Sequence, residues 1–291
     1  MILNWIKIFV YHLKQNKLFS FLNVLGLSIG IAGVIFAILY WNNENSYDQW
    51  NPEKENVFQV LNKLGATGDT WASSSIPFGK TCKATIPEIE SICFFDGWYY
   101  EEILKYENQK WMGKKIIVAD YDFFDAFPFP IIKGAKKDIL KEKNSVAISE
   151  DEAKVVFKNE DPIGKTITND GKIFIVKAVY KIIRPSSIEP NYVFGGLLKE
   201  HDMDSWGNFN YTLCVKLKKG ADAGSVLKKM QNVNFVNRTL KDAKESGQTV
   251  EQYVKENGET EVILDQLKTA RLHGTKSSAP MNFPEGRGNL Q

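Results

Sequence analysis

The chain has few residues of the types that bind metals or form disulfide frameworks. It contains three cysteines and three histidines among 291 residues. These are Cys82, Cys93, Cys214, His12, His201 and His273. The cysteines are too scattered for a disulfide framework or a metal knuckle, and no histidine belongs to an HExxH motif or an i, i+4 pair. We therefore expect no metal site. We expect buried free thiols, although Cys82 and Cys93 could pair in an oxidising compartment.

A basic surface for nucleic acid is also missing from the sequence. The formal net charge is only +2. Residues 1–41 contain three lysines and no acid, which leaves 34 basic and 35 acidic residues in the rest of the chain. Because no basic stripe with interleaved aromatic residues is present, we expect no nucleic-acid partner.

The motifs of common nucleotide-binding and hydrolytic sites are absent as well. Gly164-Lys165-Thr166 matches the end of the phosphate-binding loop GxxxxGK[ST], but Asn159 stands where the first glycine should be. The serine clusters at residues 73–75 and 186–187 have no GxSxG context and no histidine partner, so they are interpreted as loops. The sequence therefore predicts no catalytic residue, no cofactor and no enzyme activity.

An acidic cluster near aromatic residues is the remaining candidate for a binding site. It consists of Asp120, Asp122 and Asp125. The cluster lacks the spacing of a calcium-binding EF-hand loop and its terminal glutamate, so we interpret it as the solvated start of a helix.

One long apolar run is the dominant feature that is present. Residues 18–41 contain no charged side chain. As a helix they extend about 36 Å, which is enough to cross a hydrocarbon core of about 30 Å. Three lysines precede the run, and Glu44 and Asp48 follow it, so the positive-inside rule predicts a cytoplasmic N-terminus and an exported remainder. The run is longer than the core of a signal peptide and has no small-x-small exit, so we expect it to be retained as a membrane anchor.

Residues 1–17 form an amphipathic pattern in front of this run. Leu3, Ile6, Phe9 and neighbouring apolar residues fall near one helical face, with lysines on another. Two interpretations remain open: a helix lying on the cytoplasmic leaflet, or a helix that extends the membrane span inward.

The exported part alternates strand and helix patterns, which predicts an α+β fold. Ser149, with Glu152 three residues later, predicts a helix that starts with a capping box. Asn169-Asp170-Gly171 predicts a tight hairpin turn. The expected strands cover residues 57–64, 89–98, 101–107, 110–118, 145–149, 165–168, 172–180, 211–218 and 262–267, and the expected helices cover 77–86, 120–127, 150–157, 223–237 and 250–257.

Five segments of the chain, taken together and in order, carry a family resemblance. They are FSFLNVLGLSIGIA (19–32), SYDQW (46–50), YDFFDAFPFPIIKG (121–134), SVAISEDEAKVVF with DPIGKTI (145–167), and LKKGADAGSVLKKM (217–230). The chain resembles, over essentially its whole length, the MacB/FtsX-like permeases of ABC transporters, in the style of the Bacteroidetes branch.

The resemblance implies a domain organisation. It predicts one N-terminal transmembrane helix followed by a two-subdomain periplasmic domain, in which a second α/β subdomain is inserted into a porter-like subdomain. The implied parts are a cytoplasmic amphipathic helix (1–17), a transmembrane helix (18–41), the periplasmic domain (46–273, porter-like 56–86 and 211–273, inserted 87–210) and a linker (274–291).

The resemblance also implies partners and a location. Family members lie in the bacterial inner membrane, have three further membrane helices and work with a cytoplasmic ABC ATPase, typically as dimers. This sequence ends at Gln291, about where the second membrane helix is expected to begin. Either it is part of a longer chain, or the remaining helices come from another chain.

Small residues along one side of the apolar run predict a packing face. Gly26, Gly30, Gly33 and Ala37 follow a helical spacing and leave that face almost without side-chain bulk. We expect it to pack against other permease helices or a second copy in the lipid bilayer, although glycine is also common in membrane helices without such a role.

The sequence supports one leading hypothesis of function and two alternatives. The leading hypothesis is a non-catalytic permease subunit, or a fragment of one, whose periplasmic domain couples ATP-driven motion of membrane helices to a periplasmic export or signalling event. The first alternative is a single-pass anchored ligand-binding or sensor domain. An anchored hydrolase comes third, because no nucleophile and base pair is recognisable.

Overall fold

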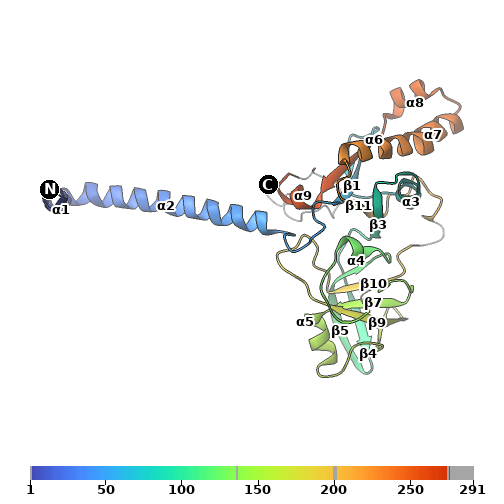
Figure 1. Ribbon diagram of the computed structural model, residues 1–291, viewed down its shortest axis with the longest axis horizontal. Coiled ribbons are helices and arrows are strands. Elements are labelled where there is room, and N and C mark those ends of the chain that lie inside the picture. Colours follow the sequence, from blue (N-terminus) through green and yellow to red (C-terminus); the bar gives the residue numbers. More distant parts are fainter. Residues whose placement is uncertain (1, 136, 199–201, 274, 276–291) are drawn as a thin grey trace. The chain divides into compact units, whose positions relative to one another are not determined.

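The chain consists of a helical unit and a larger mixed unit. The computed structural model describes residues 2–135, 137–198, 202–273 and 275, and the chain divides into residues 1–46 and 47–291 (Figure 1). The second unit has the predicted α+β composition, with strands and helices interspersed along the chain.

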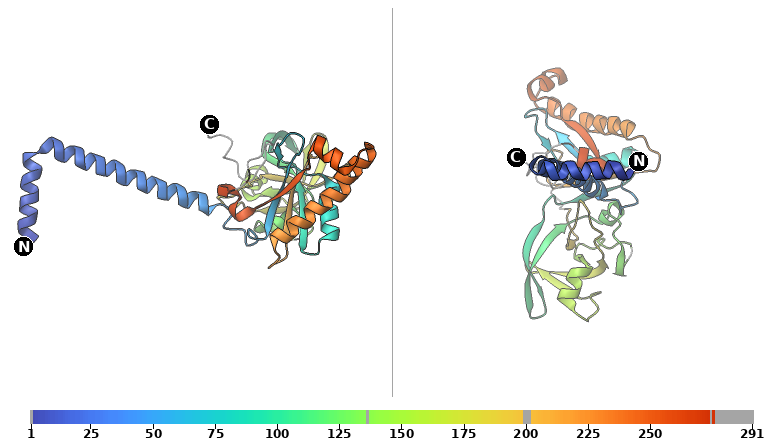
Figure 2. Two further views of the ribbon diagram at one scale, coloured as in Figure 1. Left: turned by 90° about the horizontal axis from the view of Figure 1, so that it is seen from above. Right: turned by 90° about the vertical axis from the view of Figure 1, so that its left-hand side faces the viewer.

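The first unit contains two helices, α1 (Ile2–Gln15) and α2 (Lys17–Ser46), which meet at a bend at Asn16 (Figure 2). Because of this bend, α1 is a separate helix and not a straight extension of α2. Within the described residues, α2 is the one helix long and apolar enough to cross a membrane. It continues five residues beyond the predicted end at Trp41, where Asn45 donates a hydrogen bond to the carbonyl of Trp41 and stabilises the last turns.

The second unit begins and ends in an antiparallel sheet, which we call the first sheet. Its strand order is β12-β1-β11-β3, and β2 pairs with the outer part of β1. The strands are β1 (Val57–Lys63), β2 (Thr70–Trp71), β3 (Ile89–Phe95), β11 (Thr212–Leu217) and β12 (Glu261–Gln266). The sheet therefore joins segments that lie more than 110 residues apart in the chain.

Two helices cover the first sheet and bury an apolar cluster against it. They are α3 (Ile76–Thr85) and α6 (Ala223–Asn234), and Figure 2 shows α6 beside the strands of this sheet. Asp222 caps α6 by accepting a hydrogen bond from the amide of Ser225 at 2.9 Å. A π-helical turn (Phe235–Thr239), α7 (Leu240–Glu245) and α8 (Val250–Asn257) follow α6, and α9 (Leu267–His273) follows β12.

The middle of the chain forms a closed barrel. Its strands pair in the order β9-β7-β10-β5-β4-β8, and β8 pairs again with β9, so that six strands close on themselves. The strands are β4 (Tyr100–Tyr106), β5 (Gln109–Val118), β7 (Ser145–Ser149), β8 (Thr166–Asn169), β9 (Lys172–Tyr180) and β10 (Tyr192–Phe194). β6 (Ile131–Gly134) pairs with the same edge of β9 as β8 does, further along that strand. Closure leaves the barrel with no free edge.

Alternating side chains of the barrel strands serve two separate cores. Ile116 belongs to a cluster inside the barrel with Leu104 and Phe194, whereas Ile117 belongs to a cluster shared with Val57 of the first sheet. This alternation is the period of two expected for a strand. The shared cluster includes the short helix α4 (Phe123–Ala126), so the two sheets are joined by a continuous apolar core.

Most predicted elements are present, and the differences have local causes. The turn at Asp170 and Gly171 has the predicted positive φ values of 46° and 73°. Helix α5 (Glu150–Phe157) starts after Ser149, which accepts a hydrogen bond from the Glu152 amide. The Glu152 carboxylate does not complete the capping box, because it accepts hydrogen bonds from Asn191 and Tyr192.

The expected subdomain boundary at residue 87 would place β3 in the inserted subdomain. β3 pairs with β11, so this strand lies in the first sheet and not with the inserted segment. The predicted helix over 223–237 ends as α6 at Asn234 and passes into the π-helical turn. Strands β2, β6 and β10 were not predicted, because they have only two to four residues each.

The cysteines are free and buried, as the sequence predicted. The alternative pairing of Cys82 with Cys93 is not formed. Cys93 instead lies opposite Cys214 in the register of β3 and β11. Burial raises the pKa of all three thiols, which keeps them protonated and unreactive.

Candidate functional site

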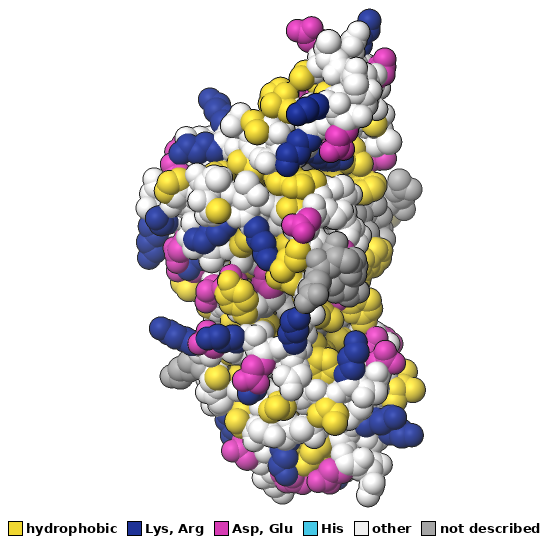
Figure 3. Space-filling view, turned by 90° about the vertical axis from the view of Figure 1, so that its right-hand side faces the viewer, with side chains coloured by type: hydrophobic (Ala, Val, Ile, Leu, Met, Phe, Trp, Pro, Cys, Tyr) yellow, Lys and Arg dark blue, Asp and Glu magenta, His cyan; other side chains and the backbone are white. Residues whose placement is uncertain are grey.

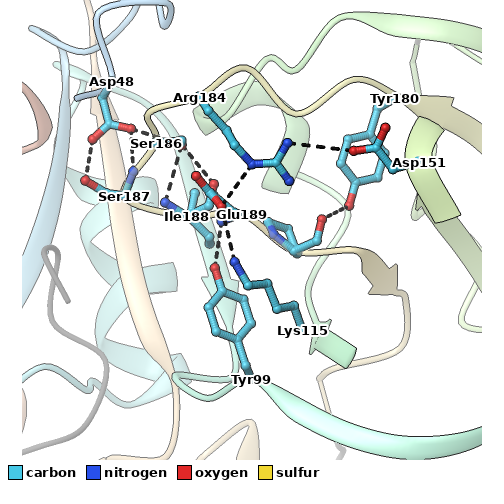
Figure 4. Close-up of polar contacts among 11 residues, drawn as sticks. Asp48, Tyr99, Lys115, Asp151, Tyr180, Arg184, Ser186, Ser187, Ile188 and Glu189 are labelled. Carbon is cyan, nitrogen blue, oxygen red and sulfur yellow. Dashed lines mark hydrogen bonds and ion pairs between the residues drawn. The ribbon is translucent and has the colours of Figure 1, made fainter. Parts of the chain in front are cut away.

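The turn that follows α2 contains a buried carboxylate. Asp48 is 1% exposed and adopts a positive φ of 56°, a conformation that aspartate tolerates better than most residues. One carboxylate oxygen accepts hydrogen bonds from the Ser187 amide at 2.9 Å and the Ser186 hydroxyl at 3.1 Å. The other oxygen accepts a hydrogen bond from the Ser187 hydroxyl. We call Asp48, Ser186 and Ser187 the Asp48 anchor (Figure 4).

The backbone of the same turn contributes a further contact. The Asp48 amide donates a hydrogen bond to the carbonyl of Pro185 at 3.1 Å. Hydrogen bonds to an ionised carboxylate are stronger than those between neutral groups, and a buried carboxylate depends on them. The anchor therefore binds the residue two positions after α2 to the loop over residues 181–191.

That loop is itself bound to the barrel. Its Glu189 carboxylate contacts the Lys115 ammonium group at 3.2 Å and Nε of Arg184 at 3.3 Å (Figure 4). The Glu189 amide donates a hydrogen bond to the Tyr99 hydroxyl at 2.6 Å. The buried Tyr180 hydroxyl, at the end of β9, donates a hydrogen bond to the carbonyl of Pro190 at 2.6 Å. These contacts hold both ends of the loop between β9 and β10 against the barrel.

Two neighbours of Asp48 strengthen this attachment. The Trp50 ring stacks on Phe129 with centroids 4.6 Å apart and an interplanar angle of 23°. Asn51 is fully buried, and its side-chain amide donates a hydrogen bond to the carbonyl of Ala126 at 3.0 Å. Both partners lie between β5 and β6, so residues 48–51 contact two separate connections of the barrel.

The acidic cluster considered from the sequence is a helix start, as predicted, with Asp122 at the N-cap of α4 and Asp125 exposed in its first turn, but Asp120 is not solvated. Asp120 is 7% exposed, and its carboxylate accepts hydrogen bonds from the Phe94 amide at 2.8 Å and the Asp122 amide at 3.2 Å. Burial raises its pKa to about 8. Its role is to join β3 to the start of α4, and the aromatic residues beside it fill the shared core. Within the described ranges, no group of three His, Cys, Asp or Glu side chains is placed to hold a metal ion.

The predicted helix-packing face lies on α2. A Cβ atom added to Gly26, Gly30 or Gly33 would meet nothing within 4 Å, and Ala37 is exposed beside them. The face is therefore open, and its packing against other helices remains a prediction.

Sequence reasoning missed the residues of the Asp48 anchor. The sequence predicts an ordinary loop at Ser186 and Ser187, and Asp48 enters the topology prediction only as a charge after the apolar run. The SYDQW segment pointed to this place, because it follows the apolar run directly. The partner serines lie about 138 residues further along the chain, so no local pattern could connect them.

The outer surface of the second unit shows mixed charge on the face seen in Figure 3. Lysine and arginine side chains there are interspersed with aspartate and glutamate, and apolar side chains lie between them. No broad area of one charge covers that face.

Comparison with known proteins gives one family and several similar folds. The model of the MacB-like periplasmic core domain matches residues 20–233. A domain from Porphyromonas gingivalis, described as part of a permease protein, is similar with a TM-score of 0.58 and 17% identity, covering 74% of this chain and 92% of that one. No curated protein gives a significant match.

Two further structures are similar at lower scores. The periplasmic region of MacB from Actinobacillus actinomycetemcomitans has a TM-score of 0.49 and 15% identity, covering 77% of this chain and 94% of that one. The extracellular domain of the noncanonic ABC-type transporter YknZ from Gram-positive bacteria has a TM-score of 0.46 and 13% identity, covering 72% of this chain and 100% of that one.

Proposed function

Because this chain belongs to the family of the MacB-like periplasmic core domain, we propose that it is a non-catalytic permease subunit of an ABC transporter, or part of one. In this proposal α2 is a membrane helix, the N-terminus is cytoplasmic, and the unit over residues 47–291 is periplasmic. The barrel corresponds to the inserted subdomain, and the first sheet with β3 corresponds to the porter-like subdomain. A cytoplasmic ATPase supplies the work, and the glycine face of α2 packs against other permease helices or a second copy.

We further propose that the Asp48 anchor couples movement of α2 to the barrel. The observation that supports this is the position of a buried, fully hydrogen-bonded carboxylate two residues after α2 ends. A flexible linker at this place would absorb a displacement of the helix. A buried anchor transmits it, because breaking it would leave polar groups without partners in the protein interior.

The test uses the full chain, extracted in mild detergent together with its ATPase and placed in lipid nanodiscs. Spin labels on cysteines introduced at Lys110 and Lys244, both exposed, report the distance between the barrel and α7. The native thiols are buried, so labelling is selective. We expect the distance distribution to change between the nucleotide-free and ATP-bound states, and we expect Asp48→Ala to abolish that change while the complex still forms.

A matched control is Asp69→Asn, which alters an exposed aspartate away from the anchor. It should leave the nucleotide-dependent change intact. Failure of any ATPase to bind the chain would overturn the permease proposal. A distance change that persists in Asp48→Ala would overturn the role of the anchor alone.

A further inference from the structure

The open end of the barrel holds a cavity of about 760 Å³. Part of its lining is apolar and continuous with the barrel interior, through Ile116, Phe174 and Phe194. The rings of Phe174 and Phe194 meet edge to face with centroids 4.6 Å apart, so this lining is firmly packed. Mouths of β-barrels are among the places where proteins bind small molecules, and the volume falls within the usual range of such sites.

The side of the cavity nearest the first sheet is acidic. Asp96, which follows β3, is 8% exposed and lines the cavity. One of its carboxylate oxygens accepts a hydrogen bond from the Val118 amide at 2.8 Å, which holds the group in place at the end of β5. Among the described residues, four carboxylates and two lysines line the cavity, so this part of the lining has an excess of negative charge. They are Asp96, Glu102, Asp170, Asp202, Lys143 and Lys172.

We propose that this cavity binds an organic cation with an apolar body, the body against Phe174 and Phe194 and the cationic group beside Asp96. An anion would meet the excess of carboxylates, and an uncharged apolar molecule would leave the buried carboxylate of Asp96 without a counter-charge. The site lies within the periplasmic unit and is distinct from the Asp48 anchor. The inference goes beyond the proposed permease function and does not depend on an ATPase.

The ionisation of Asp96 gives the site a pH dependence. Burial raises the pKa of Asp96 to about 7, a rise that Glu102 adds to and that hydrogen bonds from Val118 and Tyr100 oppose. The other titratable groups of the described residues that line this region are Tyr211, Asp170, Asp202, Lys143 and Lys172. A cation binds the ionised carboxylate, which is about a tenth populated at pH 6 and about nine tenths populated at pH 8. Affinity is therefore expected to be about tenfold higher at pH 8 than at pH 6.

The experiment titrates the full chain in nanodiscs with phenethylamine, using isothermal calorimetry. Phenethyl alcohol serves as the uncharged probe of the same shape, and phenylpropionate serves as the anionic probe. We expect phenethylamine to bind at least about tenfold more tightly than either of the other two. At pH 7, titrations in two buffers of different ionisation enthalpy should report release of about half a proton per amine bound.

The variant Asp96→Asn keeps an acceptor for the Val118 amide and removes the charge. It should weaken phenethylamine binding about tenfold and leave phenethyl alcohol binding unchanged. The control variant is Asp138→Asn, at an exposed position with a φ of 55° that asparagine also tolerates, and it should bind like the parent chain.

Three outcomes would overturn the proposal. They are no binding of phenethylamine to the parent chain, equal binding of all three probes, and equal amine affinity at pH 6 and pH 8. All three use the unaltered protein, so they remain decisive if Asp96→Asn fails to fold.

Discussion

Residues 47–51, which follow α2, and residues 265–270, toward the other end of the second unit, differ in the polar contacts that attach them to it. The first segment uses buried groups, with Asp48 at 1% and Asn51 at 0% exposure, and it contacts barrel connections. The second segment packs Leu267 and Ala270 into the shared core, but its polar contact with the turn in front of β1 lies at the surface. There the Lys268 ammonium group pairs with the Glu55 carboxylate at 2.7 Å, with both side chains largely exposed.

The difference predicts which of the two polar contacts is harder to break. Exposed ion pairs exchange readily with water and contribute little to stability. When buried hydrogen bonds to a carboxylate break, no water replaces them, so breaking them costs the desolvation free energy of the groups left unpaired. We therefore expect changes in residues 48–51 to affect the protein strongly and changes in the Lys268 contact to affect it weakly.

The largest effect is expected for Asp48→Ala. The substitution leaves the Ser187 amide and the Ser187 hydroxyl without their acceptor, whereas the Ser186 hydroxyl keeps the Ile188 carbonyl at 2.8 Å, and it places alanine at a positive φ. We expect a loss of about 3 kcal/mol in the free energy of unfolding. The measurement is urea unfolding of the full chain in detergent, followed by near-UV circular dichroism. Hydrogen exchange should rise over residues 181–191.

Asp48→Asn is the matched variant, because asparagine keeps one acceptor oxygen and tolerates the positive φ. It should lose only about 1 kcal/mol. Equal losses for the two variants would show that the anchor does not depend on its acceptor oxygen. Faster exchange in the first sheet and not in the loop would place the effect outside the anchor.

An intermediate effect is expected at Trp50. Trp50→Ala removes the ring that stacks on Phe129 and should cost about 2 kcal/mol, because the residue is only half-buried. Trp50→Phe keeps an aromatic ring and removes Nε1, a buried nitrogen with no hydrogen-bond partner among the described residues. This variant should be as stable as the parent chain in thermal unfolding followed by far-UV circular dichroism. A loss as large as that of Trp50→Ala would mean that the indole nitrogen contributes a contact of its own.

The smallest effect is expected for Lys268→Gln. The substitution removes the ion pair with Glu55, whereas the Lys268 amide still donates its backbone hydrogen bond to the Lys54 carbonyl at 3.0 Å. We expect no resolvable change in the thermal midpoint at 150 mM salt, where exposed pairs are screened. A destabilisation comparable to that of Asp48→Ala would remove the contrast between the two attachments.

The match to the family confirms the resemblance that five sequence segments predicted. Local patterns also located most of the strands and helices. Residues 145–149 and 250–257 were predicted with the bounds that the structure shows. The prediction of a solvated position was wrong for Asp120, since nothing in the local sequence indicates that the Phe94 amide lies beside it.

Spacing and composition alone determined the apolar helix, the tight turn at Asp170 and Gly171, and the alternation of strands and helices, because each depends on residues within a few positions of one another. Only the tertiary structure decided which strands pair, that β8 closes the barrel, and that Asp48 meets Ser186 and Ser187. Those contacts join residues far apart in the chain. They form only once the two cores bring the segments together and remove the water that would otherwise satisfy their polar groups.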